Sequence, residues 1–276
     1  MVKPDLRVLL VNDRAAGGVP IVVLALAEGL ARCGWQVTLL SCIEDGLDLV
    51  APARAAGVEV ELWAGFKGSG MLALLRRLRQ PFGLVVTQHR GCDILVGFLC
   101  RLRGLRHAVV VHGDPGCQTA DSGNRGMRRW LWTRTIARCC QVVTISRWVA
   151  GRVRAYAPQA QVPLAVVPNA LVRTAVVKSG VGDPGTGGLH LVACGRVYPA
   201  KRPAALLDLV EQIRASGVAC RATWIGGGPD LTATRTMIQI RGLSEHVHFI
   251  GPVENPASIY ASGDVFVHFC SIEGFG

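Results

Sequence analysis

The sequence predicts an α/β protein built from two doubly wound parallel sheets, and three observations lead to this prediction. Short runs of Val and Leu alternate with longer segments of helical periodicity, as in parallel strands that helices cover on both faces. The length of 276 residues suits one large or two ordinary domains at roughly 100 to 200 residues each. A turn-rich stretch at 174–188 interrupts the alternation, which restarts after it.

The first domain is expected to span residues 1–172 and to be complete by itself. Its apolar runs are short and rich in Val and Leu, as buried parallel strands are. They predict strands at 6–11, 36–41, 58–62, 84–87, 107–111, 141–145 and 164–167. The segments between them predict helices at 18–33, 47–56, 70–79, 92–103, 124–138 and 146–156.

The second domain is expected to span residues 173–276. Its pattern predicts strands at 189–194, 220–225, 246–250 and 264–269, with helices at 203–215, 230–241 and 255–261. The last apolar run is followed at once by the final loop, where a strand would need a loop and a helix to cover it. We therefore expect this second sheet to be incomplete and the chain to be truncated.

Positive charge is concentrated in the first domain. The net charge is +11, and residues 101–154 contain 11 Arg against two acidic residues. Trp and Leu interleave with Arg at 125–134, which suits a surface helix on anionic lipid, although a solvated Arg-rich face explains the pattern equally well. Nucleic acid is disfavoured, because no zinc-finger spacing or RNA-binding sheet motif accompanies the charge.

The cysteines and the hydropathy pattern indicate a cytoplasmic chain. The ten cysteines form no C-x-x-C pair, no signal peptide precedes them, and most lie in apolar runs as reduced buried thiols do. No segment approaches the roughly 18 apolar residues of a spanning helix. If the basic segment binds lipid, the chain would lie peripherally on the inner face of a membrane.

The first candidate loop follows the first strand and contains Gly17 and Gly18. Paired glycines let backbone N–H groups approach a ligand, and a helix N-terminus favours a phosphate. The spacing is not G-x-G-x-x-G, so a nicotinamide cofactor is not indicated. By itself the pair is equally a tight turn.

A histidine stands at the end of another predicted strand. His112 follows the strand at 107–111, and ligands of open α/β sheets bind at that carboxyl edge. It could orient a sugar hydroxyl or accept a proton. An isolated loop histidine that bonds to backbone is the simpler interpretation.

Two cations follow the first strand of the second domain. Gly195 allows a close backbone approach, and Arg196 and Lys201 can converge on one dianion at the start of the next helix. This arrangement would suit a diphosphate. Two surface cations in a loop are the alternative.

Two more glycine-rich loops end strands of the second domain. Gly226 opens a run of three glycines, and Glu273 precedes Gly274 and Gly276. A carboxylate beside exposed backbone N–H groups can bind sugar hydroxyls and phosphate. Three such loops at one sheet edge are harder to explain as turns alone.

Together these motifs resemble the retaining glycosyltransferases of the large family-four group, which have the GT-B fold of two Rossmann-like domains facing a cleft. The resemblance covers nearly the whole chain. Its most specific part, by order and spacing, is Gly195-Arg196 with Lys201, then 225–229, 247–251 and 273–276. The family's second Glu, eight positions after the first, would fall beyond the last residue.

The resemblance implies that Arg196 and Lys201 hold the diphosphate of a UDP- or GDP-linked sugar donor. Such enzymes need neither a metal nor another cofactor, because the cations and the helix dipole stabilise the leaving group. Attack from the front face needs no protein nucleophile, so none is nominated. Gly195 and Gly226 would belong to the same donor site.

The resemblance also assigns the sugar end of the site. Glu273 would bond the transferred sugar with the backbone of Gly274, Phe275 and Gly276, and His112 would contact the sugar near its reacting centre. Gly17 and Gly18 would line the cleft between the donor phosphate and the acceptor.

The implied function is transfer of a hexose to a glycan or lipid-linked acceptor with net retention, in cell-surface polysaccharide or lipopolysaccharide synthesis. A catalytically inactive remnant or nucleotide-binding module is the alternative, because the second sheet is cut. A nucleotide-sugar epimerase of the same two-domain shape is disfavoured by the combination of Arg196, Lys201 and Glu273.

Overall fold

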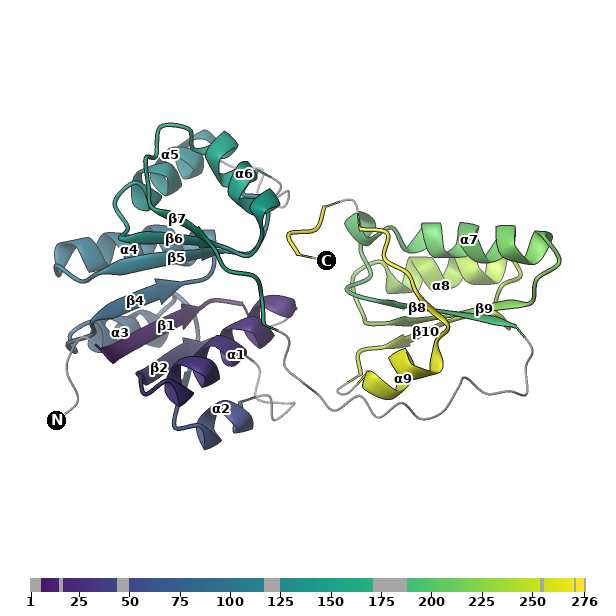
Figure 1. Cartoon of the computed structure of the whole chain (residues 1–276), viewed down its shortest axis with the longest axis horizontal. Coiled ribbons are helices and arrows are strands. Elements are labelled where there is room, and N and C mark those ends of the chain that lie inside the picture. The colour runs from purple at the N-terminus through teal and green to yellow at the C-terminus, as the bar shows by residue number, and fades with distance from the viewer. Residues whose placement is uncertain are drawn as a thin grey trace. The chain divides into compact units, whose positions relative to one another are not determined.

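The computed structural model describes residues 6–14, 17–43, 50–116, 125–170, 188–253, 256–270 and 272–275 (Figure 1). The chain divides into two compact units. The N-terminal unit comprises Met1–Leu171 together with Glu273–Gly276, and the C-terminal unit comprises Val172–Ile272.

The N-terminal unit contains one parallel sheet with the strand order β3-β2-β1-β4-β5-β6-β7. Its strands are β1 (Arg7–Asn12), β2 (Gln36–Ser41), β3 (Glu59–Leu62), β4 (Leu84–Thr87), β5 (His107–Val111), β6 (Gln141–Thr144) and β7 (Leu164–Val166). All seven strands lie within one residue of their predicted positions at each end. The chain runs outward from β1 to β3 and then crosses to β4 on the other side, which places the topological switch point between β1 and β4.

Six helices connect these strands. They are α1 (Gly18–Arg32), α2 (Ala51–Ala55), α3 (Ser69–Arg77), α4 (Arg90–Leu102), α5 (Arg125–Ile136) and α6 (Arg147–Tyr156). The helix expected at 47–56 is wrong in its start: Ala51 is its first residue, Pro52 lies in its first turn, and 47–49 fall outside the described residues.

Alternate residues of the strands face opposite sides of the sheet, and each side has its own core. Val8 and Leu10 pack with α1 and α2, whereas Leu9 and Val11 pack with α3 and α4. Helices α5 and α6 cover β5 and β6 in a further cluster. Burial on both faces explains why the strands are continuous apolar runs rather than alternating ones.

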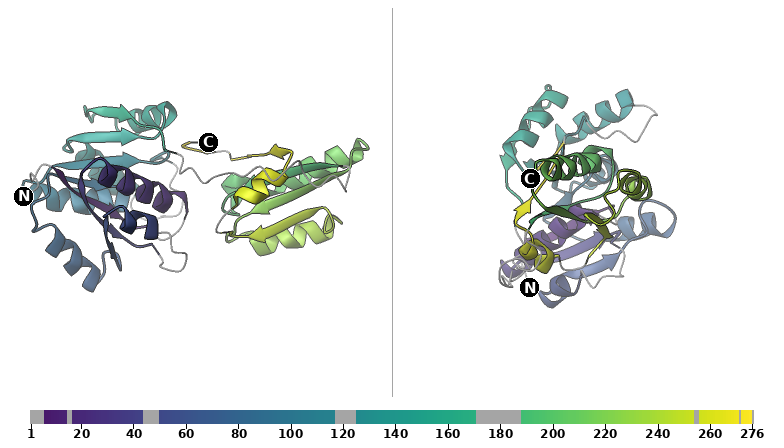
Figure 2. Two further views of the ribbon diagram at one scale, coloured as in Figure 1. Left: turned by 60° about the horizontal axis from the view of Figure 1, so that its bottom comes forward. Right: turned by 90° about the vertical axis from the view of Figure 1, so that its right-hand side faces the viewer.

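The C-terminal unit repeats the architecture with four parallel strands in the order β10-β9-β8-β11. Its elements are β8 (Leu189–Cys194), the 3₁₀ helix η3 (Pro199–Lys201), α7 (Pro203–Ala215), β9 (Cys220–Ile225), α8 (Leu231–Ile240), β10 (Val247–Gly251), α9 (Ala257–Ser262) and β11 (Val265–Phe266). Helices α7 and α8 cover one face of this sheet and α9 covers the other (Figure 2).

Two features of this unit differ from the sequence prediction. The strand expected at 264–269 is wrong in length, since β11 spans only two residues. Among the described residues it pairs with β8 alone, and Val265 and Phe266 are 44% and 55% exposed, so it lacks the packing on both faces that β8 and β9 have. The 3₁₀ turn before α7 was not predicted.

The described cysteines are all free thiols, as expected, but fewer are buried than their apolar surroundings suggested. Cys92, Cys100, Cys139 and Cys220 are buried, whereas Cys33 is exposed at the end of α1. None of the described helices combines the length and the apolar character that crossing a bilayer requires.

Candidate functional site

The loops after β1 and β4 lie at the switch point of the N-terminal sheet, where ligands of open parallel sheets bind. The first loop supplies Asp13 and Arg14, and the second supplies Gln88, His89 and Arg90. Because β1 and β4 are paired neighbours, the two loops place these polar side chains side by side.

Asp13, His89 and Arg14 form a hydrogen-bonded chain across the two loops. Asp13 Oδ2 lies 3.2 Å from His89 Nδ1, and the guanidinium of Arg14 contacts His89 Nε2. Asp13 Oδ1 is buried and has no hydrogen-bond partner among the described residues. His89 therefore presents Nε2 as an acceptor while Asp13 holds its Nδ1–H.

His112 follows β5 and contacts the loop after the neighbouring strand β4. Its Nε2 lies 2.7 Å from Gln88 Oε1. Burial, with a smaller contribution from the nearby His89, lowers the pKa of His112 to about 4. The imidazole is therefore neutral at pH 7, and it stands at the carboxyl edge as the sequence predicted.

A buried polar network lies next to this edge of the sheet and connects the strands to the helices. Thr87 Oγ1 donates to Asp93 Oδ1 at 2.6 Å and lies 2.9 Å from His107 Nε2, and Trp132 Nε1 donates to Asp93 Oδ2 at 2.8 Å. Burial raises the pKa of Asp93 to about 7, although both hydrogen bonds favour the charged form. Burial also lowers the pKa of His107 to about 4. The network joins β4, β5, α4 and α5 behind the site.

The C-terminal segment of the N-terminal unit lies against His112. Ser146 Oγ donates to the carbonyl oxygen of Gly274 at 2.6 Å, and a Cβ on Gly274 would lie 2.3 Å from the carbonyl oxygen of His112. Only glycine fits there. The structure thus brings Gly274 and His112 together, with Glu273 partly buried beside them.

The other predicted residues of this unit are less informative. Gly17 has φ of 102° and caps α1, which begins at Gly18, and both are exposed. Phe275 is 39% exposed. Gly276 lies outside the described residues.

In the C-terminal unit, the glycines after β8 and β9 hold the two loops together. A Cβ on Gly226 would lie 2.2 Å from the carbonyl oxygen of Gly195. Gly195 N donates to Ile225 O at 2.9 Å, and Gly226 N donates to Gly251 O at 2.7 Å. These two N–H groups are therefore occupied by the loops, and the glycines act by permitting a close approach of backbone to backbone.

Arg196 and Lys201 lie in the loop between β8 and α7. Arg196 is exposed, and the side-chain carbons of Lys201 lie 3.6 to 3.9 Å from the position that a Cβ on Gly195 would take. Arg202, with φ of 51°, turns the chain into α7, whose first residue is Pro203. Both cations are thus close in sequence to the N-terminus of a 13-residue helix, which itself favours an anion.

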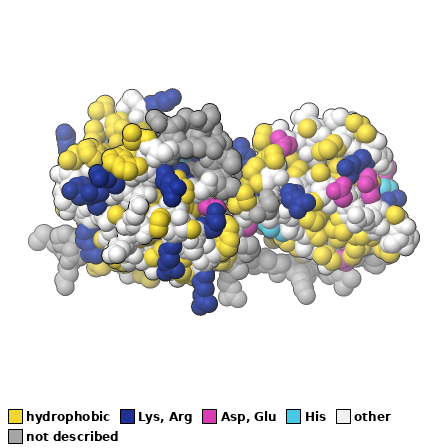
Figure 3. Space-filling model, turned by 90° about the horizontal axis from the view of Figure 1, so that it is seen from above, with side chains coloured by type: hydrophobic (Ala, Val, Ile, Leu, Met, Phe, Trp, Pro, Cys, Tyr) yellow, Lys and Arg dark blue, Asp and Glu magenta, His cyan; other side chains and the backbone are white. Residues whose placement is uncertain are grey.

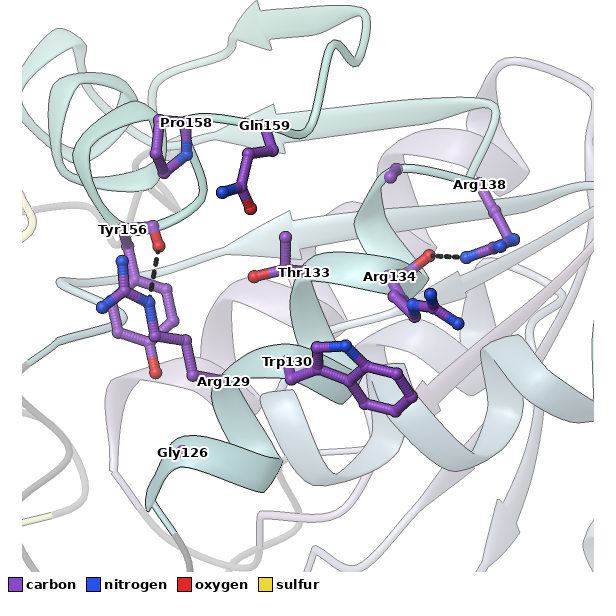
Figure 4. Close-up of a pocket in the computed structure, with 10 residues that line it drawn as sticks. Gly126, Arg129, Trp130, Thr133, Arg134, Arg138, Tyr156, Pro158 and Gln159 are labelled. Carbon is purple, nitrogen blue, oxygen red and sulfur yellow. Dashed lines mark hydrogen bonds between the residues drawn. The ribbon is translucent and has the colours of Figure 1, made fainter.

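A second surface of the N-terminal unit is built by α5. One groove of about 480 Å³ lies between α5 and the end of α6 and is lined by Arg129, Trp130, Arg134 and Arg138 among others (Figure 4). Arg134 stacks on Trp130 at 4.3 Å from the ring centroid. This is the basic segment that the sequence singled out.

A wider groove of about 740 Å³ lies between α4 and α5. Phe98 and Leu102 of α4 line it and are 58% and 67% exposed, and Arg101 and Arg106 lie beside them. Dark blue and yellow side chains mix on the upper face of this unit (Figure 3).

The sequence prediction missed Asp13, Gln88 and His89. Each stands within two residues of the end of a predicted strand, which is the signal that identified His112. Without the strand order, nothing indicated that the loops after β1, β4 and β5 are neighbours.

Comparison with known proteins places both units in families. Residues 16–172 match the family model described as Glycosyltransferase Family 4. Residues 188–276 match the model described as Glycosyl transferases group 1. No curated protein matches the chain by sequence.

Solved structures with the same fold include HepE from Anabaena in complex with UDP, with a TM-score of 0.73 at 14% identity, covering 98% of this chain and 76% of that one. A glycosyltransferase from Rickettsia africae has a TM-score of 0.70 at 11% identity, covering 96% of this chain and 73% of that one. The lipopolysaccharide outer core galactosyltransferase WaaB has a TM-score of 0.64 at 13% identity, covering 98% of this chain and 75% of that one. The predicted fold class, two Rossmann-like α/β units of the GT-B type with a smaller second unit, is confirmed.

Proposed function

Since this chain belongs to glycosyltransferase family 4, we propose that it transfers a hexose from a nucleotide diphosphate sugar to a glycan or lipid-linked acceptor with retention of configuration. The proposal includes a role in cell-surface polysaccharide or lipopolysaccharide synthesis on the cytoplasmic side of a membrane. HepE, which shares the fold, is known in complex with UDP and glucose and with UDP-glucose.

One observation carries the donor assignment. The loop from β8 to α7 presents two cations, Arg196 and Lys201, just before the N-terminus of α7. A diphosphate here would be bound by a planar guanidinium, a point charge and a helix dipole. These groups would stabilise the negative charge that develops on the leaving nucleoside diphosphate. We therefore assign no metal and no further cofactor to the reaction.

The sugar would be held by groups of the N-terminal unit. His112 is neutral and stands at the carboxyl edge beside Gly274, and the carboxylate of Glu273 is the neighbouring group in sequence. A neutral imidazole and a carboxylate both suit sugar hydroxyls, which donate and accept hydrogen bonds. In front-face attack the hydroxyl proton passes to the leaving phosphate oxygen, so no protein nucleophile is required.

The acceptor side of the proposal includes an anionic membrane surface. Phe98 and Leu102 on α4 and Trp130 on α5 are exposed apolar side chains with Arg101 and Arg134 beside them. Apolar side chains that insert below the headgroups, with cations that attract anionic lipid, are typical of peripheral binding. A lipid-linked acceptor would be reached from this surface.

Donor binding by the C-terminal unit can be measured by calorimetric titration of the full chain with UDP and with GDP. We expect one nucleotide to bind, and Arg196→Ala and Lys201→Ala each to weaken its affinity by about tenfold to a hundredfold, because each removes a charge-assisted hydrogen bond. Arg214→Ala is the matched control, since Arg214 is an exposed cation in the last turn of α7. Equal affinities in all four proteins would contradict the assigned site.

A further inference from the structure

Gln88 is a buried polar residue that the proposed reaction does not yet use. It follows β4 directly, is only 3% exposed, and directs Oε1 to within 2.7 Å of His112 Nε2. Its Nε2 is buried without a hydrogen-bond partner among the described residues. Burying a carboxamide with an unpaired N–H group costs free energy. The contact of Gln88 Oε1 with His112 is therefore the feature that calls for a function.

This contact decides which nitrogen of His112 carries the proton. A carboxamide oxygen can only accept, so His112 Nε2 must be the donor. In a neutral imidazole the other nitrogen, Nδ1, is then an acceptor. The titratable groups around it are His89 on the loop after β4, which Asp13 and Arg14 contact, Asp114 on the same loop as His112, and Glu273, which precedes Gly274.

We propose that Gln88 is a positioning residue that holds His112 as the Nε2–H tautomer, so that Nδ1 accepts a hydrogen bond from a sugar hydroxyl. The inference rests on the proposed contact between His112 and the donor sugar. An acceptor nitrogen selects a ligand group that donates, which a sugar hydroxyl does and an ionised phosphate oxygen does not. Gln88 would thus direct His112 toward the sugar and away from the diphosphate.

The tautomer is measured by long-range proton–nitrogen NMR of the nitrogen-15-labelled full chain, with the His112 signals identified from the spectrum of His112→Asn. We expect the proton on Nε2 in the unmodified chain. Gln88→Leu should spread it over both nitrogens and lower kcat for sugar transfer by about tenfold or more, with the UDP affinity unchanged. Gln80→Leu, which alters a partly buried glutamine in the turn after α3, should change neither.

Gln88→Glu supplies the second variant, because it keeps an oxygen where Oε1 stands. The Nε2–H tautomer should persist while the new carboxylate raises the pKa of His112 by about one unit or more. Loss of activity on acidification should then begin at a higher pH, since only neutral His112 can accept the hydroxyl.

A proton on Nδ1 in the unmodified chain, or an unchanged tautomer in Gln88→Leu, would overturn the proposal. If Gln88→Leu does not fold, the unmodified chain and Gln88→Glu still decide it. A chain that shows the Nε2–H tautomer but turns over no nucleotide sugar would contradict the proposed function and leave the positioning of His112 standing.

Discussion

At the scale of single residues, the glycines of the C-terminal unit are required by neighbouring backbone rather than by an open ligand space. Gly226 has φ of 130°, and a Cβ there would lie 2.2 Å from the carbonyl oxygen of Gly195. Gly227 has ordinary backbone geometry, and a Cβ on it would lie 3.5 Å from Pro252 Cδ, which is an ordinary van der Waals contact. Two adjacent glycines therefore differ sharply in what a methyl group would meet.

This difference gives a matched pair of variants. We expect Gly226→Ala to destabilise the C-terminal unit by about 1 to 2 kcal/mol or more, because a left-handed backbone and a clash with backbone add together. It should also weaken UDP binding, since the loop that carries Arg196 must move. Gly227→Ala should change the melting temperature little. Differential scanning calorimetry of the full chain measures both, and equal effects would show that the loop contact is not as described.

At the scale of elements, periodicity predicted nearly all helices and strands, because the central strands are buried on both faces and most helices have one apolar face. The errors fall where packing is weak. β11 has one neighbour and exposed side chains, and α2 has only five residues. Local sequence could not reveal the strand order, which alone brings the loops of β1, β4 and β5 together.

The two tryptophans of the basic helix α5, Trp130 and Trp132, differ in exposure although they are only two residues apart. The interleaved Trp and Arg residues at 125–134 suited a surface helix on anionic lipid and, equally, a solvated Arg-rich face. Trp132 is instead 1% exposed and donates to Asp93, whereas Trp130 is 50% exposed. Only part of the pattern is therefore available to lipid, and the remaining apolar surface comes from α4, which composition did not single out.

Vesicle binding tests the surface formed by α4 and α5. We expect the chain to bind phosphatidylglycerol-containing vesicles in sedimentation, more weakly as salt rises, because exposed charges are screened within about 10 Å at 0.1 M salt. Leu102→Ser should reduce binding severalfold. Leu72→Ser, which alters an equally exposed leucine on α3, should not. Salt-independent or absent binding would assign the arginines to a solvated face.

At the scale of the whole molecule, each unit has its own core and its own switch point at the carboxyl edge of a parallel sheet. The proposal gives the donor diphosphate to Arg196 and Lys201 of the C-terminal unit. It gives the donor sugar to His112 of the N-terminal unit, which also carries the excess positive charge and the proposed acceptor surface.

The most direct test of this account is a proton NMR time course of the full chain with a panel of UDP- and GDP-linked hexoses and candidate glycan or lipid-linked acceptors. The account predicts release of nucleoside diphosphate from at least one donor and a product that keeps the donor's anomeric configuration. Donor binding without release would indicate a nucleotide-binding module, conversion of the donor to an epimer would indicate different chemistry, and an inverted product would contradict the retaining mechanism.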